Sequence, residues 1–86
     1  MNLILMRVIV EYAVFLALSE DEVVDPDTAV SKLEELSSIL KELTPAERNI
    51  FIQFIKDMAD TEIREFKPKV RTECLLSLAE NLGLKD

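Results

Sequence analysis

An apolar run near the start of the chain, residues 3–18, most constrains how this sequence can fold, because fourteen of its sixteen residues are hydrophobic. The run is longer than a typical strand and mixes Leu, Met and Ala with Val and Ile, so it predicts a helix over about residues 2–17. A strand over residues 6–10 is the alternative. The two charged residues, Arg7 and Glu11, lie four positions apart and share one helical face. Such a helix needs cover on nearly all sides.

The same run predicts neither a membrane segment nor a signal peptide. It is shorter than the ~20 residues that span a bilayer, its charged residues fall in the middle, and no basic leader precedes it. Cys74 is the single cysteine, so no disulfide can form within the chain, and the sequence carries no sign of a secreted, disulfide-linked fold. We therefore expect a cytoplasmic protein.

Two further helix starts are marked by proline. Asp25 can accept backbone N–H bonds and Pro26 suits a first helical position, so a second helix is expected over residues 26–43. The segment Thr44-Pro45-Ala46-Glu47 has the residues of a capping box, with proline again at the first position, and it predicts a third helix over residues 45–65.

A last helix is predicted over residues 68–81, because Pro68 disfavours the helical conformation at Lys67 and Gly83 can end the helix. The third helix also offers Asp60 and Arg64 as an ion pair four residues apart. The expected apolar face of the third helix is Phe51, Ile52, Phe54, Ile55, Met58, Ala59, Ile63 and Phe66. That of the fourth is Val70, Cys74, Leu75, Leu78 and Leu82.

The expected fold is therefore all-α, a single helical domain over residues 1–86 arranged as a small four-helix bundle or a more open helical array. Three amphipathic helices rarely cover a helix that is apolar all round, so we expect a homodimer with the first helix in the centre of its shared core. In an up-down bundle, the acidic connection 20–27 and the bases near residues 64–71 lie at the same end. The two sets of charge would then neutralise each other.

The composition restricts the possible partners. With 17 acidic and 10 basic residues, the net charge is −7, which opposes binding to nucleic acids and to anionic membranes and favours a basic protein partner. The acids before the second helix are a solvated capping loop in the first interpretation and a partner-facing patch in the second. The residues are Glu20, Asp21, Glu22, Asp25 and Asp27. They lack the alternation and central glycine of a calcium loop, so no metal is predicted.

A second set of carboxylates supports an alternative function. Two pairs of acids, Glu34 with Glu35 and Asp57 with Asp60, follow each other along the chain. This pattern resembles the metal-binding acids of the all-α nucleoside triphosphate pyrophosphatases, and the resemblance implies magnesium-dependent hydrolysis of nucleotides. The match spans some thirty residues, and Ser38 stands where that family has a third glutamate. The other interpretation is that these acids line the solvent faces of two amphipathic helices.

Two weaker patterns remain. The stretch from Leu43 to Arg48 resembles the opening of helix-turn-helix modules in bacterial transcription regulators, which implies DNA binding as a third function. The acids of the expected third helix oppose that function. Lys67, Lys69 and Arg71 surround the start of the fourth helix and are a candidate anion site.

The sequence offers little material for catalysis. The chain has no histidine and one glycine, and Cys74 lies on an apolar stripe, where we expect an inert thiol. We therefore predict no catalytic residues and no cofactor. The first functional hypothesis is an acidic protein-interaction module, of the kind exemplified by immunity proteins, antitoxins and small adaptors, that forms homo-oligomers through its first helix.

Overall fold

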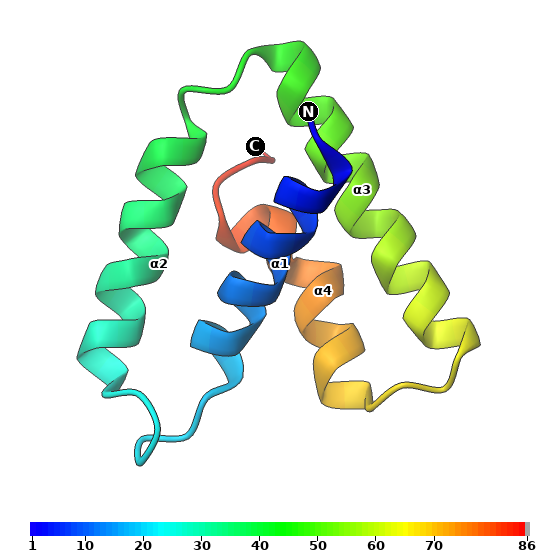
Figure 1. Ribbon diagram of the computed structural model, residues 1–86. Helices are drawn as coiled ribbons and strands as arrows, with labels where there is room; N and C mark the ends of the chain where they lie inside the picture. Colours follow the sequence, from blue (N-terminus) through cyan, green and yellow to red (C-terminus); the bar gives the residue numbers. More distant parts are fainter. Residues whose placement is uncertain (86) are drawn as a thin grey trace.

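Four helices make up this protein, and the prediction of an all-helical chain is confirmed. The computed structural model describes residues 1–85, in which there is no strand (Figure 1). The helices are α1 (Leu3–Leu18), α2 (Pro26–Leu40), α3 (Pro45–Arg64) and α4 (Lys69–Asn81). The second helix ends three residues earlier than predicted, because the chain turns there to reach the cap of α3. In this turn, the N–H of Leu43 donates to the carbonyl of Leu40 at 3.1 Å.

Side chains cap the first three helices where the sequence offers them. Asn2 accepts hydrogen bonds from the N–H groups of Ile4 and Leu5, and Asp25 accepts one from the N–H of Thr28. The capping box of α3 is complete: the N–H of Glu47 donates to the Thr44 hydroxyl at 3.1 Å, and the N–H of Thr44 donates to the Glu47 carboxylate at 3.0 Å. These bonds satisfy amides that have no partner inside their helix.

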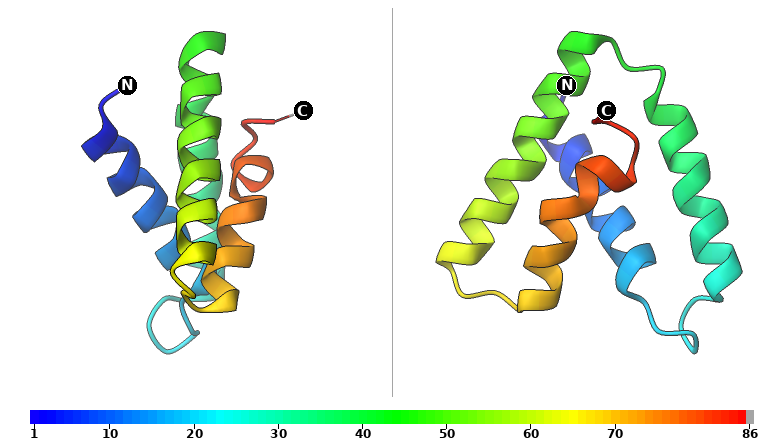
Figure 2. Two further views of the ribbon diagram at one scale, coloured as in Figure 1. Left: turned by 90° about the vertical axis from the view of Figure 1, so that its right-hand side faces the viewer. Right: turned by 180° about the vertical axis from the view of Figure 1, so that it is seen from behind.

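The helices are unequally packed. α3 and α4 form an antiparallel hairpin with the most extensive contact of any helix pair, and α1 crosses the hairpin and touches all three other helices. α2 lies against α1 and not against α3 or α4. In Figures 1 and 2, α2 and α3 diverge as the two sides of an inverted V, with α1 and α4 between them.

The core is built by α1, α3 and α4, together with the segment that follows α4. α2 contributes one buried side chain, Leu40, while Leu33 and Leu36 are partly buried against the core. The buried hydrophobic cluster consists of Met6, Val10, Ala13, Val14, Leu40, Phe51, Ile55, Ala59, Leu75, Leu78, Ala79, Leu82 and Leu84.

Two helices end in the same hydrogen-bond motif. After α4, the N–H of Gly83 donates to the carbonyl of Glu80 and the N–H of Leu84 to that of Ala79, with Gly83 at φ 73°. This is the Schellman motif, and glycine suits its left-handed position. Leu84 is buried, and the Ser37 hydroxyl donates to the carbonyl of Leu82 at 2.8 Å, which ties α2 to this end of α4.

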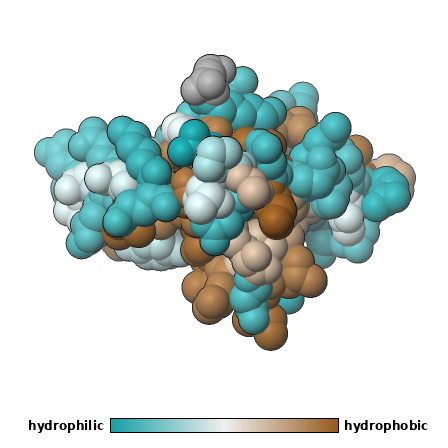
Figure 3. Space-filling view, turned by 90° about the horizontal axis from the view of Figure 1, so that it is seen from above, coloured by the Kyte–Doolittle hydropathy of each residue, from teal (hydrophilic) through white to brown (hydrophobic). Residues whose placement is uncertain are grey.

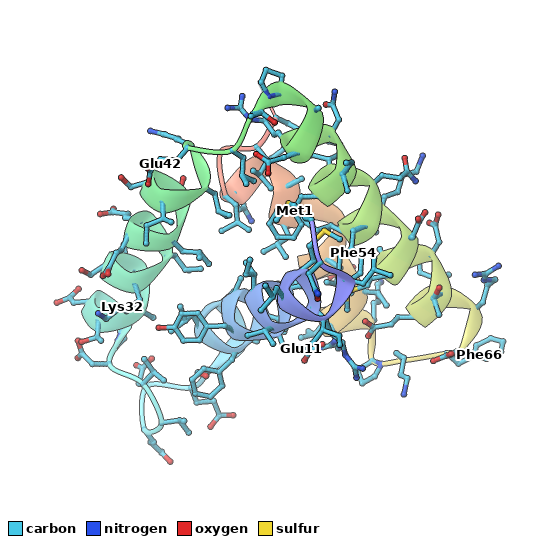
Figure 4. All side chains as sticks on the ribbon, turned by 45° about the horizontal axis from the view of Figure 1, so that its top comes forward. Met1, Glu11, Lys32, Glu42, Phe54 and Phe66 are labelled. Atoms are coloured by element: carbon cyan, nitrogen blue, oxygen red, sulfur yellow. The ribbon has the colours of Figure 1, made fainter. Side chains whose placement is uncertain are left out.

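The motif after α3 places Phe66 in the left-handed position, with φ 55°, and the N–H of Lys67 donates to the carbonyl of Glu62 at 3.0 Å. The prediction that Phe66 belongs to the apolar face of the third helix is wrong. The helix ends before it, and its side chain is 94% exposed, turned away from the other helices (Figure 4).

Two other residues assigned to apolar faces are exposed, Ile63 on α3 and Val70 on α4. Both lie near the α3–α4 turn, which is at the corner of the molecule opposite α2 (Figure 1).

Candidate functional site

The side of α1 that faces away from the core carries more exposed large apolar side chains than any other helix of the described chain. We call the outer face of α1 the set Ile4, Leu5, Val8, Tyr12 and Phe15, whose exposed fractions are 73, 61, 59, 44 and 49%. The opposite side of the same helix, with Met6, Val10 and Ala13, is buried. Within the single chain, the other helices therefore cover α1 on one side only.

The spacing of the outer face follows a regular pattern. Leu5, Val8, Tyr12 and Phe15 are separated by three, four and three residues, which is the 3.5-residue repeat of a seam between paired helices. In Figure 1 no other helix lies in front of α1, and the left view of Figure 2 shows α1 on one side of the molecule. From above, hydrophobic atoms gather on the edge of the molecule where α1 faces outward (Figure 3).

The acidic connection between α1 and α2 is exposed, as expected. Asp25 caps α2, with its carboxylate 3.1 Å from the N–H of Thr28, which confirms its expected capping role. Glu20, Asp21, Glu22 and Asp27 make no ion pair with any base in residues 1–85. Glu20, Asp21 and Glu22 lie in the connection, and Asp27 lies in the first turn of α2.

The expected neutralisation of these acids by the bases near residues 64–71 is wrong. Both connections lie at the same end of the molecule, but at separate corners (Figure 1). Lys69 pairs with Glu73 at 3.7 Å on its own helix, and Arg64 donates to the hydroxyl of Thr61. The expected ion pair of Arg64 with Asp60 does not form.

Arg71 joins three helices through two carboxylates. Its Nε donates to Glu62 of α3 at 2.5 Å, and its two terminal nitrogens donate to both oxygens of Glu11 on α1. The side chain of Glu62 is 10% exposed, so Arg71 supplies the hydrogen bond that water cannot easily provide there. The hydrogen bonds to Glu62 and then to Glu11 raise the pKa of Arg71.

The proposed anion site at the start of α4 is therefore incomplete. The guanidinium of Arg71 is used within the chain, while Lys67 and Lys69 are exposed and point to no common partner in the described structure. Pro68 is the N-cap and offers no side-chain hydrogen bond. Sequence reasoning missed the role of Arg71 because Glu11 lies 60 residues away in the chain.

The four acids of the hydrolase hypothesis do not converge. Glu35 pairs with Lys32 at 3.3 Å on α2, whereas Asp57 accepts a hydrogen bond from Gln53 at 2.8 Å on α3. These two helices do not pack against each other, and residues 1–85 contain no group of three or more acids, cysteines or histidines arranged to hold a metal ion. The geometry gives no support to a magnesium site made of Glu34, Glu35, Asp57 and Asp60.

A groove of about 730 Å³ lies between α1, α3 and the α3–α4 turn. Phe54 and Met58 contribute apolar surface, while Arg7, Glu11, Asp57 and Lys67 bring charges of both signs. Figure 4 shows Glu11 and Phe54 on the two helices that bound it. The groove is open to solvent and holds no arrangement of nucleophile and base.

Cys74 is half-buried, and burial raises the pKa of its thiol, although nearby Arg71 acts in the opposite direction. A thiol held in its protonated form is a poor nucleophile.

Within residues 1–85, none of the helices combines the length and hydropathy needed to cross a membrane. Comparisons with protein-family models, with curated proteins and with solved structures give no match for this chain.

Proposed function

We propose that this protein is a small, non-catalytic interaction module that self-associates through the outer face of α1. The supporting observation is the row of large apolar side chains that the other three helices leave uncovered. Their exposed area is on the order of 500 Å², near the upper end of the largest patches on typical monomers, about 300–600 Å². Covering this surface with a second copy stabilises the assembly, because burial of apolar area is the main driving force of association.

Sedimentation equilibrium between about 1 and 500 µM tests the proposal, since a weak dimer forms across this range. We expect a reversible monomer–dimer equilibrium for the natural sequence. Val8→Asp places a charge in the centre of the outer face and should give a monomer, because an unpaired charge is costly to bury.

Val30 on α2 provides a matched control, because it is a helical valine with 55% exposure, against 59% for Val8. Val30→Asp should leave the equilibrium unchanged. A natural sequence that is monomeric over the whole range would contradict the proposal, as would two valine variants that behave alike.

The acidic connection is the surface we assign to a basic protein partner. The connection and the first turn of α2 offer four exposed carboxylates that form no ion pair within residues 1–85, Glu20, Asp21, Glu22 and Asp27, and the chain has a net charge of −7. Charges of this kind accelerate encounter with a partner of opposite sign and give an affinity that falls with salt.

Neutralising three of these acids tests the second surface without removing the cap of α2. The variant Asp21→Asn, Glu22→Gln, Asp27→Asn should lose salt-sensitive retention of basic proteins from a cell extract. The control is Glu34→Gln, Glu42→Gln, Glu80→Gln, which changes the net charge equally at exposed sites elsewhere. Equal loss in both variants would show that total charge, and not this loop, determines retention.

A further inference from the structure

The outer face of α1 is not uniform along its length. Its seam starts with the smaller side chains Leu5 and Val8 and ends with the aromatic side chains Tyr12 and Phe15. All four are between 44 and 61% exposed, so each is available to a second molecule. The order of sizes restricts how two such helices can pack, because protein interfaces fill space nearly as densely as protein interiors.

We propose that two copies pair their α1 helices antiparallel, so that Phe15 of each packs against Leu5 of the other, and Tyr12 against Val8. The inference rests on the proposed self-association and specifies its geometry. Both pairs are centred on residue 10 of the chain, so one two-fold axis generates all four contacts. A closed two-fold interface stops at the dimer and does not propagate into fibres.

Size complementarity favours this direction over the parallel one. In the antiparallel pair, every layer combines a large side chain with a smaller one, and the distance between the helices stays even. In a parallel pair, Tyr12 and Phe15 meet their own copies at one end while Leu5 and Val8 meet theirs at the other. The helices would then splay apart at the aromatic end and leave gaps at the other end.

The flanks of the seam agree with this direction. One flank, the row of residues beside the seam, consists of Ile4, Glu11 and Leu18, which are spaced seven residues apart. In an antiparallel pair, this row meets the same row of the other copy. Exposed Ile4 of one copy then approaches exposed Leu18 of the other. The opposite flank, with Ile9 and Leu16, is mostly covered by the core of its own copy and offers little surface to a partner.

The two Glu11 side chains approach each other near the two-fold axis, and their repulsion is offset within each copy. Both oxygens of the Glu11 carboxylate accept hydrogen bonds from the guanidinium of Arg71. Each copy therefore brings a paired charge to the axis. A carboxylate without such a partner would oppose the contact.

The area available predicts a weak dimer. Two outer faces on the order of 500 Å² each give a total below the roughly 1,200–2,000 Å² of standard stable interfaces. We therefore expect a dissociation constant in the micromolar range. The left view of Figure 2 shows α1 on one side of the molecule, with the connection to α2 projecting on the same side beyond the C-terminal end of the helix.

Directed disulfide formation tests the direction of pairing. In a Cys74→Ser background, which removes the natural cysteine, Leu5→Cys and Phe15→Cys are prepared as separate proteins of different mass. They are mixed at 100 µM and oxidised under mild conditions, and the disulfide-linked species are counted by mass spectrometry. We expect the mixed dimer, with one Leu5→Cys chain linked to one Phe15→Cys chain, to exceed the statistical mixture several-fold, and each protein alone to cross-link slowly. Val30→Cys is the control for random collisions, and circular dichroism checks that each variant is helical.

The outcomes separate the direction of pairing from self-association itself. Rapid cross-linking of each protein with itself, in a sample that sediments as a dimer, would overturn the antiparallel geometry and leave the proposed function intact. A dimer in which neither combination cross-links faster than the Val30→Cys control would overturn the seam as the interface. A sample that remains monomeric would overturn both proposals.

Discussion

The α3–α4 hairpin and the α1–α2 pair are both two helices joined by a short connection, yet they differ in how they use their apolar side chains. The hairpin packs along its length, and most of its large apolar residues are buried or half-buried. In the other pair, α2 buries one residue, and α1 buries one side while seven of its large apolar residues are exposed.

The difference follows from the pattern of each helix. α3 and α4 are amphipathic, so one apolar stripe meets another and the polar sides remain in water. α1 has two charged residues in sixteen, and the three neighbouring stripes can cover it from one side only. A helix that is apolar all round therefore stabilises the core and at the same time offers a surface for association.

The largest expected effect comes from two phenylalanines in these two regions. Phe51 of α3 is fully buried, whereas Phe15 of α1 is 49% exposed. Phe51→Ala should lower the free energy of unfolding by about 3–5 kcal/mol, because it leaves a cavity, while Phe15→Ala should cost less than about 1 kcal/mol in the monomer. Urea unfolding at low micromolar concentration measures both. Equal losses would mean that the outer face of α1 is part of the core.

Arg71 connects the two regions, so its loss should be the next largest effect. Arg71→Met keeps much of the side-chain volume and leaves the nearly buried Glu62 without a partner. We expect a loss of about 2 kcal/mol, below the value for fully buried pairs because Glu11 and Arg71 are partly in solvent. Lys69→Met, at a pair that is mostly exposed, should change stability by less than about 0.5 kcal/mol. A loss at Arg71 no larger than at Lys69 would contradict this role.

The ends of α3 and α4 should respond in opposite directions. Gly83→Ala forces a left-handed alanine whose Cβ would lie 3.1 Å from the Ser37 hydroxyl oxygen, and it should cost about 1–2 kcal/mol. Phe66→Gly relieves the same backbone conformation at an exposed position and should stabilise the protein by about 1 kcal/mol. Thermal unfolding measures the pair. Destabilisation by Phe66→Gly would show that the Phe66 ring makes contacts that hold the hairpin.

The cap of α3 should give the smallest effect and a dependence on pH. Thr44→Ala removes one half of the capping box and should cost about 1 kcal/mol. Hydrogen bonds with Thr44 lower the pKa of Glu47 below its ordinary 4.5 in the folded state. The resulting stability is therefore present above pH 4.5 and is lost as the pH falls through the folded pKa. In Glu47→Gln this part of the acid dependence should disappear, as measured by urea unfolding between about pH 3 and 7.

Local signals in the sequence were sufficient for the helices and their starts. Asp25, Pro26 and the segment from Thr44 to Glu47 begin helices where the sequence predicts, because caps and proline act on amides two or three residues away. The seam of α1 was also present in the spacing of its residues. Its recognition required knowing which side of an almost entirely apolar helix remains uncovered.

The sequence by itself therefore determined four helices, their caps and an excess of apolar surface on the first of them, because these depend on neighbours within one or two helical turns. The tertiary structure alone decided that α2 stands apart from α3, that Phe66 lies outside the core, and that Arg71 binds Glu11 and Glu62. These outcomes depend on how the helices cross. The partner of a charge, or the covered side of an apolar helix, is set by residues tens of positions away in the chain.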